Sequence, residues 1–515
     1  MNGADRLCDG LLANDVDVCF ANPGTSEMHF VAALDRKPQM RCILGLFEGV
    51  VTGAADGYAR MAGKPASTLL HLGPGLGNGI ANLHNARRAR TPMINIVGNH
   101  ATYHRQYNAP LNSDVETLAA PMSDWVRSTE SATEIGADLN DAWTAAVGTP
   151  GVATLILPAD TAWNDVPDAP VLRAQRPAPR PFEAAVAAQV RQATTRGMRV
   201  ALLLGAEALK GKALEIAGRI AAHSDVKLLC QTSVARAERG AGRVVVSPLP
   251  YRIEAAVKAL ENVDMLVLVG EDEPVAFFAY PGRPNKPARP DAAVIEYAPP
   301  GADLLEALGH LAQELGAERA QPVLSRAELP EAPQDGALTG ELVTQLVARM
   351  LPDQAIVVDE SITAGWRFGE QARGAAQHDV LDLTGGAIGI GLPLSTGAAV
   401  ACPDRKVVCL QADGSGMYTI QALWTQAREQ LDVVTVVFAN RTYSTLHGEM
   451  RNVGVNDFGE NARRMLNLDT PALDWVALAK GHGVEAARAG TVAQFSQLLA
   501  SAIGRKGPFL IEAVI

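Results

Sequence analysis

The chain has 515 residues, too many for one hydrophobic core, so about three domains are expected. With 48% hydrophobic and 20% charged residues, the composition is that of a globular protein and excludes a mainly disordered chain. A net charge of −11, with Lys and Arg scattered along the sequence, argues against a nucleic-acid partner.

The sequence gives no sign of a membrane span or of export. No apolar run approaches the roughly 18 residues that a spanning helix needs. The start, MNGADRLCDG, lacks the basic and then apolar pattern of a signal peptide. The six cysteines show no CxxC pairing and mostly lie in apolar runs, as buried thiols do in a reducing compartment. We therefore expect a cytoplasmic protein without a membrane partner.

Short apolar runs alternate with helical patterns from the beginning of the chain. Four of them lead into turn residues: DVCFANPG (17–24), ASTLLHLGPG (66–75), TPMINIVGN (91–99) and VATLILPAD (152–160). Such runs are typical of buried parallel strands followed by glycine-rich turns. The pattern predicts an α/β protein with doubly wound, mostly parallel sheets.

Two proline-rich stretches interrupt this pattern and predict the domain boundaries. They give extended linkers at 166–183 and 319–336. The domains expected between them are residues 1–165, 184–318 and 337–515.

In the third domain, a strand, a helix and a second strand are expected between Lys406 and Asn440. Because such a unit places its two strands in parallel, Asp413 and Asn440 should meet at the carboxyl edge of the sheet. Their oxygens suit a hard cation such as Mg²⁺, and the glycine-rich turn after Asp413 suits phosphate. The alternative is that Asp413 caps the following helix and Asn440 belongs to a turn.

Two regions together resemble the thiamine diphosphate-dependent 2-oxo acid decarboxylases and acetolactate synthases, above all benzoylformate decarboxylase. One is Leu46 to His100, with LFEGVVTGAADGYAR, and the other is ADGSGMYTIQALWT, from Ala412. ANPGTSEMHF near the start adds to the resemblance, which covers the whole chain. It implies a pyrimidine-binding domain at 1–165, a central domain at 184–318 and a diphosphate-binding domain at 337–515.

The resemblance implies that Mg²⁺ is bound by Asp413, Asn440 and the backbone carbonyl of Thr442. Ala412 and Ala439 depart from the family motif, but neither replaces a metal ligand of that motif. The neighbouring residues implied near the diphosphate are Gly414, Ser415 and Tyr443.

The same resemblance makes Glu48 the catalytic carboxyl group that hydrogen-bonds the cofactor's aminopyrimidine. The cofactor carries the difficult chemistry, while the protein sets its tautomer and orientation. Gly386 would provide a carbonyl to the pyrimidine, and Ile388 would be the bulky residue that bends the cofactor. The further cofactor-binding residues expected are Pro23, Gly24, Asn78 and Thr363.

On the substrate side, His71 matches a decarboxylase histidine that handles protons, although a core histidine bonded to backbone would look the same. Thr25, or Ser26 if the register slips by one, would hold the substrate carboxylate. Phe278 stands where the family has a second catalytic histidine.

His447 and Glu449 fall where an aromatic pocket wall is expected. His447 could supply the missing proton relay. Glu449 would be awkward beside an anionic substrate or a phenyl ring.

The resemblance implies decarboxylation of a 2-oxo acid through an enamine intermediate, which is then protonated to give an aldehyde. One alternative is a carboligase that joins two 2-oxo acids, as acetolactate synthase does. Another is a non-catalytic subunit that binds thiamine diphosphate. A homodimer with Glu48 of one chain facing Asp413 of the other is the expected minimum, and a homotetramer is usual in the family. FAD is not expected, because the central domain has no GxGxxG.

Overall fold

A computed structural model describes residues 1–329 and 331–515, which form two compact units. The first comprises Met1–Pro177, Leu329–Ala372 and Leu383–Ile515, and the second Ala178–Glu328 and Arg373–Asp382. The first unit thus holds residues of both the first and the third predicted domains. One residue of the predicted linker 319–336, residue 330, lies outside the described residues.

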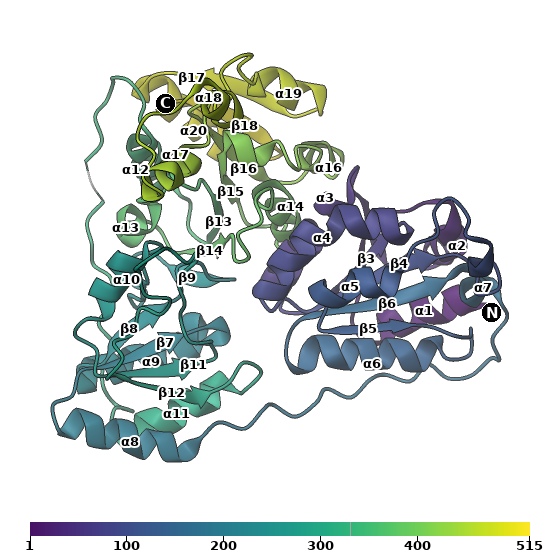
Figure 1. The fold of residues 1–515 in the computed structure, drawn as a ribbon, viewed down its shortest axis with the longest axis horizontal. Coiled ribbons are helices and arrows are strands. Elements are labelled where there is room, and N and C mark those ends of the chain that lie inside the picture. The colour runs from purple at the N-terminus through teal and green to yellow at the C-terminus, as the bar shows by residue number, and fades with distance from the viewer. Residues whose placement is uncertain (330) are drawn as a thin grey trace. The chain divides into compact units, whose positions relative to one another are not determined.

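The amino-terminal part of the first unit contains a parallel sheet with strand order β2-β1-β3-β4-β6-β5 (Figure 1). Its strands are β1 (Val18–Asn22), β2 (Arg41–Leu44), β3 (Ala66–Leu70), β4 (Met93–Asn99), β5 (Trp125–Ser128) and β6 (Val152–Pro158). Its helices are α1 (Gly3–Ala13), η1 (Thr25–Glu27), α2 (Met28–Asp35), α3 (Glu48–Ala62), α4 (Leu72–Arg88), η2 (Arg105–Tyr107), α5 (Val115–Ala119), η3 (Ala120–Met122), α6 (Ile135–Gly148) and α7 (Ala159–Trp163).

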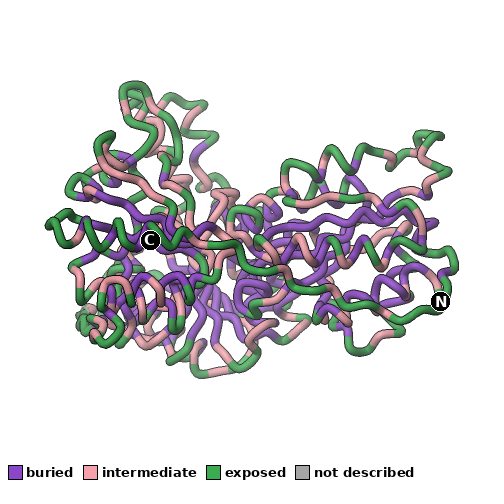
Figure 2. Tube along the Cα trace, turned by 90° about the horizontal axis from the view of Figure 1, so that it is seen from below, coloured by how far each residue is buried: buried purple, intermediate pink, exposed green. Residues whose placement is uncertain are grey.

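Helices cover both faces of this sheet, so its inner strands are buried along their whole length. Helices α1, α2 and α6 share one apolar core with the strands, whereas α3 and α4 pack on the other side. Figure 2 shows these strands as continuous buried stretches. Burial on both faces explains the unbroken apolar runs in the sequence.

The carboxyl-terminal part of the first unit contains parallel strands in the order β17-β18-β16-β15-β13. The strands are β13 (Ala355–Glu360), β15 (Val407–Ala412), β16 (Val433–Ala439), β17 (Glu485–Ala489) and β18 (Phe509–Val514). The helices are α12 (Gly340–Met350), α13 (Phe368–Gln371), α14 (Gly391–Ala401), α15 (Asp413–Gly416), α16 (Ala422–Arg428), α17 (Ser444–Asn452), α18 (Glu460–Leu466), α19 (Trp475–Gly481) and α20 (Val492–Ile503).

The predicted strand–helix–strand unit around Asp413 is confirmed, because β15 and β16 pair in parallel. Its helix differs from the expected one. A single turn, α15, holds the glycine-rich segment, and the longer helix begins only at Ala422. Glycine disfavours helix, and the hydroxyl of Thr419 donates to the carbonyl of Gly389 at 2.7 Å, so the residues between the helices are fixed by another segment.

The second unit is also α/β, with a parallel sheet of strand order β10-β8-β7-β11-β12. Its strands are β7 (Val200–Leu204), β8 (Lys227–Cys230), β10 (Ser247–Pro248), β11 (Met265–Val269) and β12 (Ala293–Ala298), with β9 (Ala237–Arg239) and β14 (His378–Asp382) forming an antiparallel pair. Its helices are α8 (Ala184–Thr195), η4 (Ala206–Leu209), α9 (Gly211–Ser224), α10 (Ile253–Leu260), α11 (Leu304–Leu315) and η5 (Ala372–Gly374), which begins at the last residue of the first unit.

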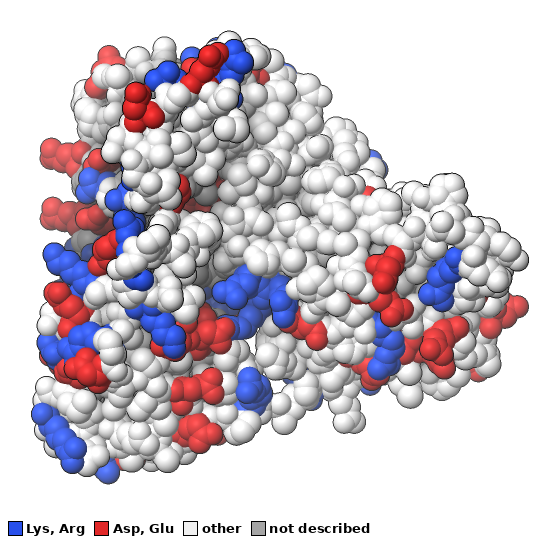
Figure 3. All heavy atoms as spheres, viewed as in Figure 1, with Lys and Arg blue, Asp and Glu red and all other residues white. Residues whose placement is uncertain are grey.

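Charged side chains of both signs are interspersed on the face shown in Figure 3. Within the described part of the chain, no helix is both long and apolar enough to cross a membrane.

Candidate active site

Glu48 is the first residue of α3 and is only 8% exposed. The side-chain amide of Asn78, on α4, donates to its Oε2 at 3.0 Å. An ideal Cβ at Gly75 would lie 2.9 Å from Oε1, so a glycine there leaves space for this oxygen. The structure thus brings together two predicted cofactor residues and holds one carboxyl oxygen in place.

His71 follows β3 and contacts a carboxylate that the sequence analysis missed. Its Nδ1 lies 2.8 Å from Oε2 of the buried Glu27, which also accepts the backbone N–H of Gly24 at 2.7 Å. Ser26 Oγ is 3.4 Å from the same Nδ1, whereas Thr25 is exposed. Glu27 follows Gly24 by three residues, the spacing of a helix-capping acid, and this signal could have identified it.

Asp413 is buried at the end of β15, where predicted metal and diphosphate residues converge. Its Oδ1 accepts the N–H of Gly414 at 2.8 Å and its Oδ2 that of Arg441 at 2.6 Å. Burial raises its pKa above the usual value, and these backbone bonds oppose the change. An ideal Cβ at Gly414 would lie 2.4 Å from the ring of Tyr443, so only glycine lets this ring cover the turn.

The other two predicted metal ligands lie on the loop after β16. Asn440 Oδ1 accepts the N–H of Thr442 at 3.1 Å, and its Nδ2 donates to Ser444 Oγ at 3.1 Å. The Thr442 hydroxyl donates to the Leu466 carbonyl at 3.1 Å and lies 2.9 Å from Nε2 of His447. His447 therefore lies against Thr442, one of the predicted metal ligands.

These three residues together fit a magnesium ion. They offer a carboxylate, an amide oxygen and a backbone carbonyl, all oxygen donors of the kind Mg²⁺ prefers. Across the described residues, no group of three or more His, Cys, Asp or Glu side chains could hold a metal. Any cation at this edge would thus depend on amide and carbonyl oxygens, and it would stabilise the buried charge of Asp413.

A second buried carboxylate, Glu360 at the end of β13, organises the turn that contains the predicted pyrimidine contacts. It accepts the N–H groups of Gly389 at 2.6 Å and Gly391 at 2.7 Å, and the side chain of Gln411 at 3.0 Å. Gln411 also donates to Ser415 Oγ at 2.8 Å. Through Gln411, Glu360 therefore links the turn after Ile388 to Ser415, which is predicted to lie near the diphosphate. It was not predicted, because nothing near it in the sequence shows these distant partners.

The segment before that turn lies against α4 of the same chain. Gly386 has a left-handed φ of 77°, which favours glycine. Asn85 donates to the Ala387 carbonyl at 2.7 Å. Asn82 donates to the Gly49 carbonyl at 2.7 Å and the Gly389 carbonyl at 3.4 Å. Asn82 thus connects Gly49, the residue after Glu48, to Gly389, the residue after Ile388, within one chain.

The remaining predicted residues are less closely tied to this region. Thr363 is exposed in the loop after β13, and Pro23 and Ile388 are half-buried. Glu449 lies on α17 and accepts from Asn452 at 3.4 Å. Phe278 belongs to the second unit, where it is 52% exposed and packs edge-on against Phe277.

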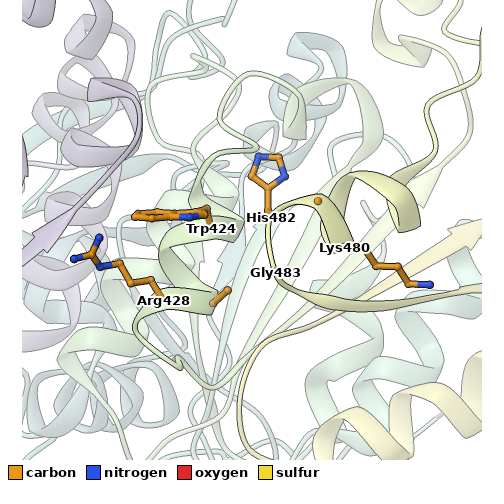
Figure 4. Close-up of a pocket in the computed structure, with 7 residues that line it drawn as sticks. Trp424, Arg428, Lys480, His482 and Gly483 are labelled. Atoms are coloured by element: carbon orange, nitrogen blue, oxygen red, sulfur yellow. The ribbon is translucent and has the colours of Figure 1, made fainter.

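A separate groove of about 620 Å³ lies between α16 and α19. Figure 4 shows Trp424 and Arg428 on one side and Lys480 and His482 on the other. None of the predicted site residues lines it.

Comparison with known proteins identifies the class. Residues 1–119 match the N-terminal TPP binding domain of thiamine pyrophosphate enzymes, and residues 366–513 match the C-terminal TPP binding domain. The chain therefore belongs to the thiamine pyrophosphate (thiamine diphosphate) enzymes, in the group of decarboxylases and acetolactate synthases.

Two individual relatives are similar to the chain over nearly its whole length. A Mycobacterium tuberculosis protein provisionally named acetolactate synthase large subunit IlvX is 48% identical, over 100% of this chain and 99% of its own. Benzoylformate decarboxylase of Pseudomonas aeruginosa is 29% identical over 96% of this chain and 95% of its own.

Solved structures confirm the predicted α/β fold. The 4-hydroxybenzoylformate decarboxylase of Rhodococcus jostii superposes with a TM-score of 0.85 at 24% identity, covering 100% of this chain and 99% of that one.

Proposed function

We propose that the chain catalyses the thiamine diphosphate- and Mg²⁺-dependent decarboxylation of a 2-oxo acid to an aldehyde. The observation that carries this proposal is the proximity of His71 to Glu48. An ideal Cβ at Gly75 would lie 2.9 Å from the Glu48 carboxylate and 3.3 Å from the Cβ of His71. An imidazole held by Glu27 beside the cofactor-directed carboxyl group is suited to proton transfer onto the product.

When bound, thiamine diphosphate supplies the electron sink that lets the 2-oxo acid lose CO₂. Glu48, oriented by Asn78, would hydrogen-bond the aminopyrimidine ring. The carbonyl of Gly386 would accept from its amino group, and Ile388 would fix the bend of the cofactor.

On the substrate side, Ser26 or Thr25 would hold the carboxylate by a hydroxyl hydrogen bond. Glu27 fixes the ring of His71 through Nδ1, which leaves Nε2 to donate or accept a proton.

Magnesium binding by Asp413, Asn440 and the Thr442 carbonyl is part of the proposal. Calorimetric titration with thiamine diphosphate should show binding with Mg²⁺ and little with EDTA. Asp413→Ala should lose the Mg²⁺-dependent part of the affinity. Asp457→Ala, which removes a fully exposed acid in the chain after β16, should keep it. Equal affinity of Asp413→Ala and wild type would place the metal elsewhere.

The reaction is tested with pyruvate, 2-oxoisovalerate and phenylglyoxylate, scored for CO₂ release and for product mass. We expect CO₂ with the corresponding aldehyde. Cofactor binding without CO₂ release from any of the three would contradict the proposal and favour a non-catalytic binding subunit.

A second candidate is a carboligase that adds the decarboxylated fragment to another 2-oxo acid. The 48% identity to a protein provisionally named as an acetolactate synthase favours it. The same assay distinguishes the two, because a carboligase yields a 2-hydroxy-3-oxo acid in place of the aldehyde.

We also propose a homodimer with shared sites as the minimum assembly, with a homotetramer as the usual form, and a cytoplasmic location. The family resemblance supports the assembly, and the lack of CxxC motifs in the sequence supports the location.

A further inference from the structure

His100 is a second histidine at the sheet edge that carries His71. β3 and β4 are adjacent parallel strands, with Leu70 paired to Val97. His71 follows the end of β3, and His100 follows Asn99, the last residue of β4. Because parallel neighbours end at the same edge, both imidazoles leave the sheet on the side of Glu48.

The ring of His100 has one nitrogen without a partner. Its Nε2 is buried and has no hydrogen-bond partner among the described residues. Leaving such a nitrogen unpaired costs free energy, so a substrate atom or a water molecule that reached it would be bound favourably. His100 makes a tilted ring contact with His104, at 5.7 Å between centroids.

The surroundings of His100 favour its neutral form. Burial, and then the positive charges available to His104 and His71, lower its pKa from the usual value of 6.5. The titratable groups nearby are His104 on the same loop, His71 with its partner Glu27, and Asp160 on α7, whose carboxylate is hydrogen-bonded by Thr102. A neutral imidazole with a free nitrogen is a proton acceptor.

We propose that His100 is a second proton-transfer residue of the active site, acting on the substrate's 2-oxo oxygen while His71 acts on the carbon. This inference rests on the proposed decarboxylation. There the bond to the carboxylate carbon breaks, its electron pair stays on the remaining carbon, and a C–H bond forms with one proton taken from solvent. The oxygen carries a proton after the carbonyl is attacked and loses it only when the aldehyde leaves, after CO₂ release. Neutral His100 accepts the proton from the oxygen at that last step, while His71 delivers a proton to the carbon.

The test uses His100→Phe, which keeps a ring against His104 but removes the nitrogen. With the best 2-oxo acid of the three above, we expect aldehyde formation to fall by about 100-fold or more. The control is His223→Phe, an exposed histidine in the last turn of α9, which should form aldehyde at the wild-type rate.

A second assay separates proton transfer from a structural effect. Two equivalents of ferricyanide accept the electron pair left after CO₂ release, so that water and the 2-oxo acid give a carboxylic acid, CO₂, two protons and two equivalents of ferrocyanide. Because no aldehyde forms, His100→Phe should release CO₂ here near the wild-type rate. Its calorimetric affinity for thiamine diphosphate should be unchanged. The pH profile of kcat for aldehyde formation should also change. The part of the wild-type profile that follows the titration of His100 should be missing in His100→Phe.

Each other outcome overturns the inference. Wild-type aldehyde formation by His100→Phe would overturn it and leave the proposed function standing. Equal losses in both assays, or loss of cofactor binding in both His100→Phe and the smaller, polar His100→Asn, would make His100 structural. If the wild type released no CO₂ from any of the three acids, the proposed function would fail first.

Discussion

At the scale of single residues, Glu48 is the group on which the proposed chemistry depends most directly. Replacing it by Gln keeps the shape and the contact to Asn78 but removes a proton-exchanging group. We expect Glu48→Gln to bind thiamine diphosphate with near wild-type affinity and to lose about 100-fold or more in kcat. Calorimetry and CO₂ release measure the two quantities.

The matched control for this prediction is Glu116→Gln, an exposed acid in the first turn of α5. It should leave both quantities unchanged. Normal turnover in Glu48→Gln would refute the proposed role.

Glu360 gives a pH-dependent prediction for stability. Burial raises its pKa above the usual 4.5 in the folded protein. Because the pKa of Glu360 is higher in the folded than in the unfolded protein, Glu360 stabilises the fold fully when the pH is below about 4.5. This stabilisation is lost as the pH rises through the pKa that Glu360 has in the folded protein. Glu360→Gln should therefore reduce the free energy of unfolding by about 1–3 kcal/mol near pH 5, because backbone donors lose their acceptor, and by less near pH 8.

Urea unfolding of wild type and Glu360→Gln at the two pH values measures this difference. Glu370→Gln, on the exposed side of α13, is the control and should show no such trend. A penalty that grows with pH would show that the carboxylate is stabilised as an anion.

At the scale of elements, the close approach of α3 and α14 fixes the position of α3, the helix that begins with Glu48. An ideal Cβ at Gly397 would lie 1.8 Å from the Ala54 carbonyl oxygen and 2.6 Å from the Tyr58 nitrogen. Gly397→Ala must force the helices apart, so we expect a loss of about 1–3 kcal/mol and a lower unfolding temperature.

The matched control is Gly309→Ala, inside α11, where a Cβ would meet nothing within 4 Å. It should stabilise its helix by up to about 1 kcal/mol, because alanine is the better helix former. Thermal unfolding of both variants tests the pair, and an unchanged or raised unfolding temperature for Gly397→Ala would contradict the packing argument.

The strands were predictable from sequence because burial on both faces leaves unbroken apolar runs, as in β4 and β6. The convergence of Asp413 and Asn440 was also predictable, since parallel strands end at one edge. Glu27, Glu360 and His100 were not identified. Glu27 had a readable signal in its three-residue spacing from Gly24. Glu360 depends on partners distant in sequence, and the unpaired nitrogen of His100 is visible only once the packing around it is known.

At the scale of the whole molecule, the main question is whether one active site uses one chain or two. The family resemblance predicts that Glu48 faces Asp413 of a partner. Within one chain, however, Asn82 already connects the backbone beside Glu48 to Gly389. A functional test can separate the two arrangements.

Mixing two inactive variants makes that test. Glu48→Gln and Asp413→Ala, unfolded together and refolded at equal concentrations, should form about half heterodimers, each with one intact and one doubly altered site, and so recover about a quarter of wild-type activity. Each variant refolded alone should stay inactive, and refolded wild type sets the reference. If the site lies within a single chain, every chain carries one defect and no mixture regains activity. Recovery that also falls on dilution would show that the dimer is the active unit.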